Sequence, residues 1–169
     1  MKYSYDGYLT QQKLKVLLSD IYGENLVQNE VRVPNTRMKW DFFIVNNNNK
    51  ETIIEFDGDQ HYRDSLVIQR DNRKDIIAKE LGYDIIRIPY FIQLTSQMFY
   101  YYFNYKLEIE TNFGHGYIKS NVFPASYCQL GIVRYKKELL DIPNNVNNDI
   151  KKTLISKSEK YGSDYVNIF

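Results

Sequence analysis

One short segment, Glu51–Asp57, most constrains what this chain can fold into. Its sequence, ETIIEFD, has the β-branched and aromatic residues of a strand, yet Glu55 stands between Ile54 and Phe56. A charged side chain inside an apolar strand is normally paired with an opposite charge or bound to a metal ion. We therefore expect this strand to belong to a sheet of which one face carries chemistry.

Helical and strand periodicities alternate along the chain around this segment. The predicted elements are, in order, a helix over 10–22, strands over 26–33, 39–45 and 51–57, a helix over 66–81, and a strand over 83–88. Thr10 is the expected N-cap of the first helix, while Gly23 and Gly82 are placed to end the two helices. The three consecutive strands predict an antiparallel meander, and the whole pattern predicts a mixed α/β fold.

The rest of the chain is predicted to be largely helical. We expect a helix over 93–107 and two further helices over about 130–140 and 146–161. This order predicts a core domain over residues 1–108 and a C-terminal helical extension over 109–169 that packs on it. The sequence assigns no chemistry to the extension.

The asparagine-rich turn between the second and third strands predicts how their side chains meet. If Asn46–Lys50 joins the two strands symmetrically, Asp41 lies directly opposite Glu55. Like charges placed opposite each other destabilise a sheet, so something must compensate their repulsion. Residues two apart share a face of a strand, so Asp57 projects beside Glu55. Three carboxylates are therefore expected on one patch.

This patch has the donors that a hard divalent cation prefers. Mg²⁺ binds oxygen ligands and commonly uses one or two carboxylates together with phosphate and water. We therefore expect Asp41, Glu55 and Asp57 to bind Mg²⁺ or Mn²⁺. Beyond Gly58, His61 is close enough in the chain to return over the carboxylates, and an imidazole can move a proton near neutral pH. Together these residues suit the hydrolysis of a phosphodiester bond.

Each of these residues also has an ordinary structural interpretation. An Asp-Gly pair such as Asp57 with Gly58 is common in simple turns. His61 alone is more often a surface residue, and Asp41 alone would merely begin a strand. Glu55 is the residue that these interpretations explain poorly, because it interrupts an apolar strand. The combination favours the metal site.

Two stretches of the chain resemble a known family of nucleases. The segments WDFFIV and ETIIEFDGDQHY, followed by RDNRKDIIAKELGYDIIRI, resemble the core of the PD-(D/E)xK nucleases, and in particular the branch that contains the very-short-patch-repair endonuclease. The resemblance implies a restriction-endonuclease-like core of helix, three-stranded meander, helix and strand, with endonuclease activity. First helices of this branch often carry a glutamate, where this chain has Gln11 and Gln12.

The same resemblance implies a role for each candidate residue. Asp41 corresponds to the first aspartate of the motif and Glu55 to its glutamate. Asp57 stands at the position that lysine usually holds in the superfamily, and a carboxylate there is usual in this branch. His61 matches the histidine of the branch. Asp71 corresponds to an acidic position that joins the active site in some members.

Composition argues against several other classes of protein. The single cysteine, Cys128, cannot form an intramolecular disulfide, and no run of about 18 apolar residues offers a membrane span. Two histidines and one cysteine are too few for the usual structural zinc site. The first residues carry no secretory signal. We therefore expect a soluble, cytoplasmic protein with no organic cofactor.

The leading hypothesis is a Mg²⁺-dependent endonuclease that hydrolyses phosphodiester bonds in DNA. Cutting both strands would call for two active sites and hence a homodimer. A catalytically inactive DNA-binding module of the same fold is the alternative, and a structural or interaction protein is the third. The net charge of +1 does not decide among them, because phosphate binding needs a local basic surface rather than a basic total.

Overall fold

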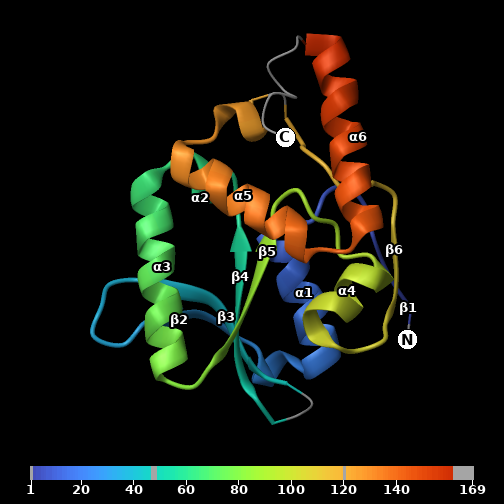
Figure 1. The fold of residues 1–169 in the computed structure, drawn as a ribbon. Coiled ribbons are helices and arrows are strands. Elements are labelled where there is room, and N and C mark those ends of the chain that lie inside the picture. The colour runs from blue at the N-terminus through green and yellow to red at the C-terminus, as the bar shows by residue number, and fades with distance from the viewer. Residues whose placement is uncertain (1, 47–48, 120, 162–169) are drawn as a thin grey trace. The chain divides into compact units, whose positions relative to one another are not determined.

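The computed structural model describes residues 2–46, 49–119 and 121–161 and has a mixed α/β fold (Figure 1). The predicted turn at Asn46–Lys50 includes residues 47–48, and the predicted extension includes residue 120 and residues 162–169, all of which lie outside the described residues. Within the described residues, no helix is long and apolar enough to cross a membrane.

Contacts along the chain define two units, each built from segments that are distant in sequence. The first, which we call the sheet unit, comprises Leu9–Asp57 and Gln69–Pro89. The second, which we call the helical unit, comprises residues 2–8, Gly58–Ile68 and residues 90–161. The domain boundary predicted after residue 108 stays a prediction.

The sheet unit contains a four-stranded sheet in the order β2-β3-β4-β5. Its strands are β2 (Gln28–Arg32), β3 (Lys39–Val45), β4 (Glu51–Asp57) and β5 (Asp84–Pro89). The first three pair antiparallel, which confirms the predicted meander, and β5 lies parallel to β4. Phe43 pairs with Ile53, which is the predicted register. Phe42 pairs with Ile54, and one position beyond that pair the register sets Asp41 opposite Glu55.

The two long helices of this unit have the predicted caps. Helix α1 (Gln11–Tyr22) begins at Thr10, whose Oγ1 accepts a hydrogen bond from the Lys13 N–H at 3.2 Å. Helix α3 (Ser65–Glu80) is followed by Gly82, which has a φ of +82°, a left-handed conformation that glycine adopts without strain.

Apolar residues from both helices cover the sheet. α1 buries its leucines, and α3 contributes to a cluster that also includes residues of the sheet. The buried members of that cluster are Val33, Trp40, Ile53 and Ala78. Because this cluster packs α3 along the sheet, the polar residues of α3 in the sheet unit are brought to the strands that carry the carboxylates.

The helical unit has a two-stranded parallel sheet, β1-β6, that the sequence did not predict. Its elements are β1 (Lys2–Tyr5), α2 (Gln60–Arg63), α4 (Ser96–Phe103), β6 (Glu108–Thr111), the 3₁₀ helix η2 (Pro124–Ser126), α5 (Gln129–Asp141) and α6 (Asn144–Tyr161); a further 3₁₀ helix, η1 (Glu24–Leu26), belongs to the sheet unit. Helices α5 and α6 confirm the two helices predicted near the C-terminus.

The helix predicted over 93–107 is shorter than expected. It begins after Thr95, whose Oγ1 accepts a hydrogen bond from the Met98 N–H at 3.2 Å. It ends at Asn104, which takes a left-handed φ of +49°. A threonine cap and an asparagine in a left-handed conformation commonly begin and end helices. The helix therefore stops at these residues, although the aromatic pattern continues on both sides of them.

Tyrosines form much of the core of the helical unit. Tyr62, Tyr117 and Tyr135 are among the largest fully buried side chains of the chain. The Tyr117 and Tyr135 hydroxyls lie 2.7 Å apart, and the Tyr62 hydroxyl donates to Glu138 Oε2 at 2.6 Å. These contacts satisfy hydroxyl groups that would otherwise be costly to bury. The abundance of tyrosine therefore has a structural explanation here.

Candidate functional site

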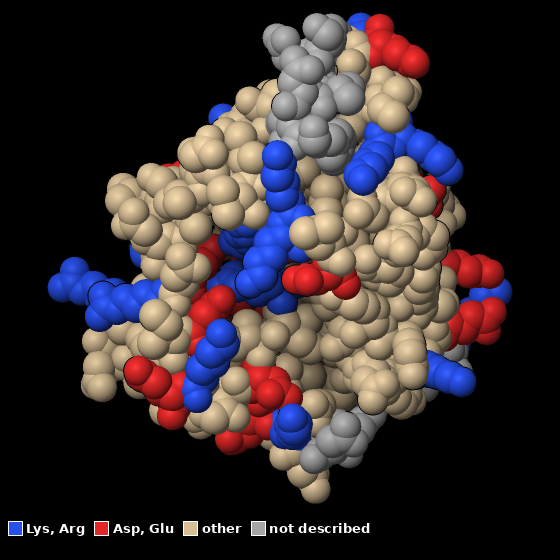
Figure 2. All heavy atoms as spheres, viewed as in Figure 1, with Lys and Arg blue, Asp and Glu red and all other residues tan. Residues whose placement is uncertain are grey.

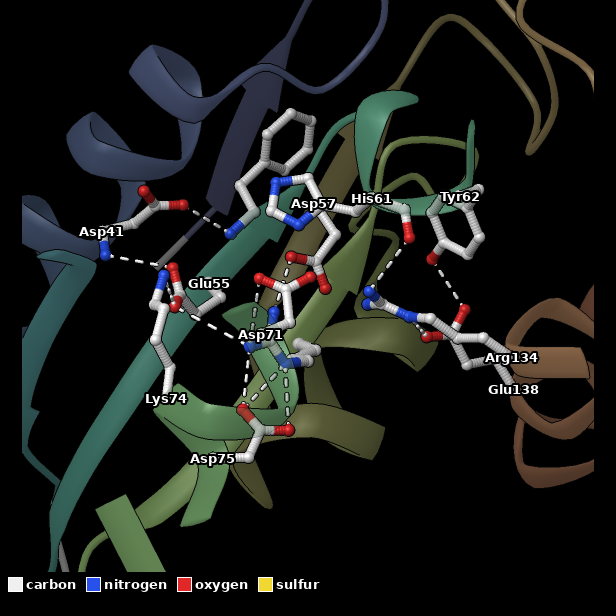
Figure 3. A network of polar contacts seen from close by, with 12 residues as sticks. Asp41, Glu55, Asp57, His61, Tyr62, Asp71, Lys74, Asp75, Arg134 and Glu138 are labelled. Carbon is white, nitrogen blue, oxygen red and sulfur yellow. Dashed lines mark hydrogen bonds and ion pairs between the residues drawn. The ribbon is translucent and has the colours of Figure 1, made fainter. Parts of the chain in front are cut away.

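The sheet unit gathers acidic and basic side chains into one polar network (Figure 3). Its members are Asp41 on β3, Glu55 and Asp57 on β4, Asp71, Lys74 and Asp75 on α3, and Arg87 on β5. The three α3 residues are spaced by three and four positions, so they share one face of the helix. The parallel pairing of β4 with β5 sets Arg87 beside Glu55.

Asp41 and Glu55 are linked through the backbone of the two strands. The Asp41 N–H donates to Glu55 Oε2 at 3.2 Å, and the Phe56 N–H donates to Asp41 Oδ2 at 2.8 Å. Hydrogen bonds from backbone N–H groups stabilise carboxylate charge. They supply part of the compensation that two facing carboxylates require.

Glu55 is almost fully buried, with 2% of its surface exposed. Its Oε1 forms an ion pair with Lys74 and lies 3.8 Å from Arg87 Nη2. Burial raises the pKa of Glu55 to about 7, against the lowering effect of Lys74 and Arg87, and the nearby Asp41 adds to the rise. Near neutral pH this carboxyl group therefore exists in both protonation states.

Arg87 connects the remaining carboxylates. Its Nη1 donates to Asp57 Oδ1 at 2.7 Å, its Nη2 donates to Asp75 Oδ1 at 2.8 Å, and Nη2 lies 3.7 Å from Asp71 Oδ1. Burial alone would lower the pKa of Arg87, but the carboxylates of Asp57, Asp71 and Asp75 outweigh it, so the pKa is raised well above its usual value. The guanidinium is therefore permanently charged.

The network contains five carboxylates and two cations, so negative charge is in excess. Asp57 is fully buried and Asp71 is 4% exposed, where unbalanced charge is expensive. One oxygen of Asp57 and one of Asp71 lie within 4.8 Å of each other. Ligands of an octahedral Mg²⁺ lie about 3–4 Å apart, so small side-chain movements would let one cation contact both.

Four of the five predicted site residues lie in the sheet unit. Asp41, Glu55, Asp57 and Asp71 all belong to the network of the sheet unit. Among the described residues, no group of three close ligand atoms joins the predicted metal-binding set of Asp41, Glu55 and Asp57, whereas Asp57 and Asp71 do come close. The structure places His61, the fifth predicted site residue, on α2 in the helical unit.

Helix α5 holds α2, and with it the backbone of His61. The Cys128 N–H donates to the Tyr62 carbonyl oxygen at 3.1 Å, and Arg134 Nη1 donates to the His61 carbonyl oxygen at 3.2 Å. Gly131 packs so closely that a Cβ built on it would lie 1.8 Å from the Tyr62 carbonyl oxygen. The Arg134 guanidinium also lies over the Tyr62 ring, at 4.8 Å from its centroid.

The other histidine has a structural role. His115 Nδ1 accepts a hydrogen bond from the Gln93 N–H at 2.9 Å, and burial lowers the pKa of the imidazole. Both features favour the neutral ring.

Lys74, Asp75 and Arg87 are the members of the network that the sequence did not predict as site residues. All three lie in the segments that carry the family resemblance. Lys74 stands three positions after Asp71, and Arg87 lies on the strand that follows. A helical wheel of α3 would have placed Lys74 beside Asp71, but only the parallel pairing of β5 with β4 brings Arg87 to Glu55.

The face shown in Figure 2 is not uniformly basic. On the face shown in Figure 2, lysine and arginine side chains lie beside aspartate and glutamate side chains. This mixture agrees with the net charge of +1. Comparisons of the chain with protein families, with curated proteins and with solved structures found no match.

Proposed function

We propose that the chain is a metal-dependent endonuclease that hydrolyses phosphodiester bonds in DNA, with a restriction-endonuclease-like core. The excess of buried carboxylates in the sheet unit is the observation that carries the proposal. A buried cluster that serves only stability would be expected to pair its charges. Here two cations face five carboxylates, of which Glu55, Asp57 and Asp71 are buried. The sequence resemblance to PD-(D/E)xK nucleases supports the same reading.

The residues of the network fit Mg²⁺ or Mn²⁺. Their donors are carboxylate oxygens, which hard divalent cations prefer. Asp57 and Asp71 are the proposed ligands that lie closest together, with Asp41 and Glu55 beside them. When bound, the cation would polarise the phosphate and lower the pKa of a water molecule.

The protein side chains have distinct proposed roles around that cation. Arg87 orients Asp57 and Asp71 through its ion pairs with their carboxylates. Lys74 pairs with Glu55 and lowers its pKa, against the larger rise that burial causes. His61 follows Asp57 by four positions in the chain and stays the predicted carrier of the proton that leaves the attacking water.

A cleavage assay tests this proposal. Supercoiled, linear, branched and single-stranded DNA would be incubated with the protein in Mg²⁺, in Mn²⁺ and in EDTA. We expect metal-dependent cleavage, and supercoiled DNA distinguishes a nick from a double-strand cut. Asp57→Asn should lower the rate by more than about 100-fold. Loss of a residue that only supports a metal ligand typically costs about 10- to 100-fold, and Asp57 is itself a proposed ligand. Asp84→Asn, a change to an exposed carboxylate of the same sheet, should not alter it.

Two outcomes would contradict the proposal. If Asp57→Asn cut DNA at the wild-type rate, the network would not be the active site. If the wild type bound DNA but cut none of these forms with either metal, the chain would be the non-catalytic DNA-binding module.

A further inference from the structure

A polar pocket of about 480 Å³ opens in the sheet unit at Asp41. It is lined by the first turns of α1, by β2 and by β3, and its polar lining residues are Gln11, Gln12, Lys15, Asn29, Glu30 and Asp41. Small-molecule pockets commonly measure about 300–1,000 Å³, so one nucleotide could enter this one. The pocket thus adjoins a residue of the proposed active site.

The lining chemistry indicates what kind of group this pocket binds. Gln11, Gln12 and Asn29 carry neutral amides, each of which offers both hydrogen-bond donors and an acceptor. The charged lining consists of two carboxylates and one ammonium group, which disfavours a phosphate as the occupant. Phe42, the one aromatic residue of the lining, is only 2% exposed and offers little surface for stacking.

Glu30, at the edge of the pocket, has an unusual backbone conformation. Its neighbours in β2 pair regularly with β3, Asn29 with Phe42 and Val31 with Trp40. Glu30 itself has a φ of +48°, which is uncommon for a residue with a side chain. Its carboxylate is held by Lys39 at 2.7 Å. Such a backbone persists only where its surroundings enforce it, and functional sites are where it concentrates.

We propose that this pocket receives the edge of a DNA base next to the scissile phosphate and reads it through hydrogen bonds from Gln11, Gln12 and Asn29. The proposal rests on the proposed endonuclease function. Side-chain amides match the mixed donors and acceptors of base edges, and an amide that contacts a base at two points discriminates it from the others. The pocket would therefore give the enzyme a base preference at one position beside the cut.

The test uses a duplex library with randomised positions, presented to the full chain in two ways. Duplexes retained by the protein in Ca²⁺, which permits binding, and duplexes cut in Mg²⁺ are sequenced separately. The variants are Gln12→Ala and Asn29→Ala, which come from different sides of the pocket. Gln28→Ala is the matched control, because it removes a neighbouring amide of β2 that does not line the pocket.

We expect the wild type to prefer one base at one position, and each pocket variant to reduce that preference by about 5- to 150-fold, the range for a two-point contact. The control should retain the preference. A wild type with no preference in either selection, or a preference that survives both pocket variants, would overturn the proposal. A preference that appears in binding while no DNA is cut would support the pocket and refute the endonuclease.

Discussion

The two regions that carry the candidate functional residues are held in place by different forces. In the sheet unit, ion pairs position the carboxylates, with Arg87 contacting three aspartates. In the helical unit, close packing positions α2, because Gly131 lies against the Tyr62 backbone with no room for a side chain. A carboxylate can give up its contact with Arg87 and bind a metal cation instead. Two closely packed backbones cannot rearrange in this way without losing their contact.

This difference suits the two tasks that we assign to the regions. A metal site must accept a cation and release it, and carboxylates already shared with Arg87 and Lys74 can redistribute their contacts when one arrives. A proton carrier must keep its position, and α5 fixes the backbone of His61 by packing and by hydrogen bonds. The predictions below test whether this division holds, from the largest expected effect to the smallest.

Replacing His61 tests the task assigned to α2. General acid–base assistance is worth about 10²–10⁴ in rate, so His61→Ala should slow single-turnover DNA cleavage by a factor in that range. Metal affinity, measured by calorimetry, should remain at the wild-type value, and Gln60→Ala on the same helix should cut normally. A parallel loss of metal affinity and activity would make His61 a ligand, and the division between the regions would fail.

Removing Arg87 tests the claim that charge holds the sheet unit. Arg87→Met leaves Asp57, Asp71 and Asp75 without their shared cation, and such losses typically cost about 3–5 kcal/mol in free energy of unfolding. Urea unfolding in EDTA measures this cost. Arg73→Met, at an exposed position of α3, should change stability by less than about 0.5 kcal/mol.

Added Mn²⁺ should stabilise the Arg87→Met protein by more than it stabilises the wild type, because the cation relieves the carboxylates that Arg87 no longer contacts. Equal stabilisation of both proteins would show that the metal and Arg87 act on different groups.

Glu55 predicts an unusual dependence of stability on pH. The pKa of Glu55 is about 7 in the folded protein and 4.5 for the unperturbed group. Between pH 4.5 and pH 7, the folded protein therefore keeps a proton on Glu55 that the unfolded protein has lost. The resulting contribution to the free energy of unfolding is fully present below pH 4.5 and is lost as the pH rises through 7. The total loss is about 3 kcal/mol. In EDTA, Glu55→Gln should therefore be more stable than the wild type at pH 8 but not at pH 4.

Unfolding curves at both pH values measure this effect, with Glu51→Gln at an exposed position of the same strand as the control. A difference between Glu55→Gln and the wild type that does not vary with pH would mean that the pKa of Glu55 is the same in the folded and unfolded protein. The ion pair with Lys74 would then offset burial.

Adding one methyl group to α5 tests the claim that shape holds the helical unit. Gly131→Ala would place its Cβ 1.8 Å from the Tyr62 carbonyl oxygen, so α5 and α2 must separate. Overpacking of this kind costs about 1–3 kcal/mol, measurable as a lower melting temperature. Gly114→Ala has open space around the added carbon and should be nearly neutral. Equal stability of the two variants would show that the α2 contact is not tightly packed.

The sequence predicted the sheet unit better than the helical unit for a physical reason. Its strands alternate with turns whose residues carry clear signals, so the meander and the register that sets Asp41 against Glu55 could be read directly. β1 and β6 have four residues each, too few for a periodicity to show. The contacts of α5 with α2 join residues about 70 positions apart, and no local pattern encodes such a pairing.

The candidate site shows the same limit. Glu55 was found because it breaks an apolar pattern within its own strand. Arg87 was missed because its importance depends on which strand β5 joins, and the sequence alone does not specify that neighbour. The place of His61 on a short helix was missed because four residues, Gln60–Arg63, form one turn that resembles a loop in sequence.

Metal binding by the sheet unit is the central claim, and titration with Mn²⁺ in the absence of DNA tests it most directly. Melting temperature and calorimetric heat would be followed at pH 8 for the wild type, for Asp57→Asn and for the control Asp84→Asn. Mn²⁺ at ten times its dissociation constant should stabilise the wild type by about 1.4 kcal/mol, or roughly 3–6 °C. Asp84→Asn should behave the same, and Asp57→Asn should show neither shift nor heat. A wild type that neither shifts nor releases heat at millimolar Mn²⁺ would contradict the account.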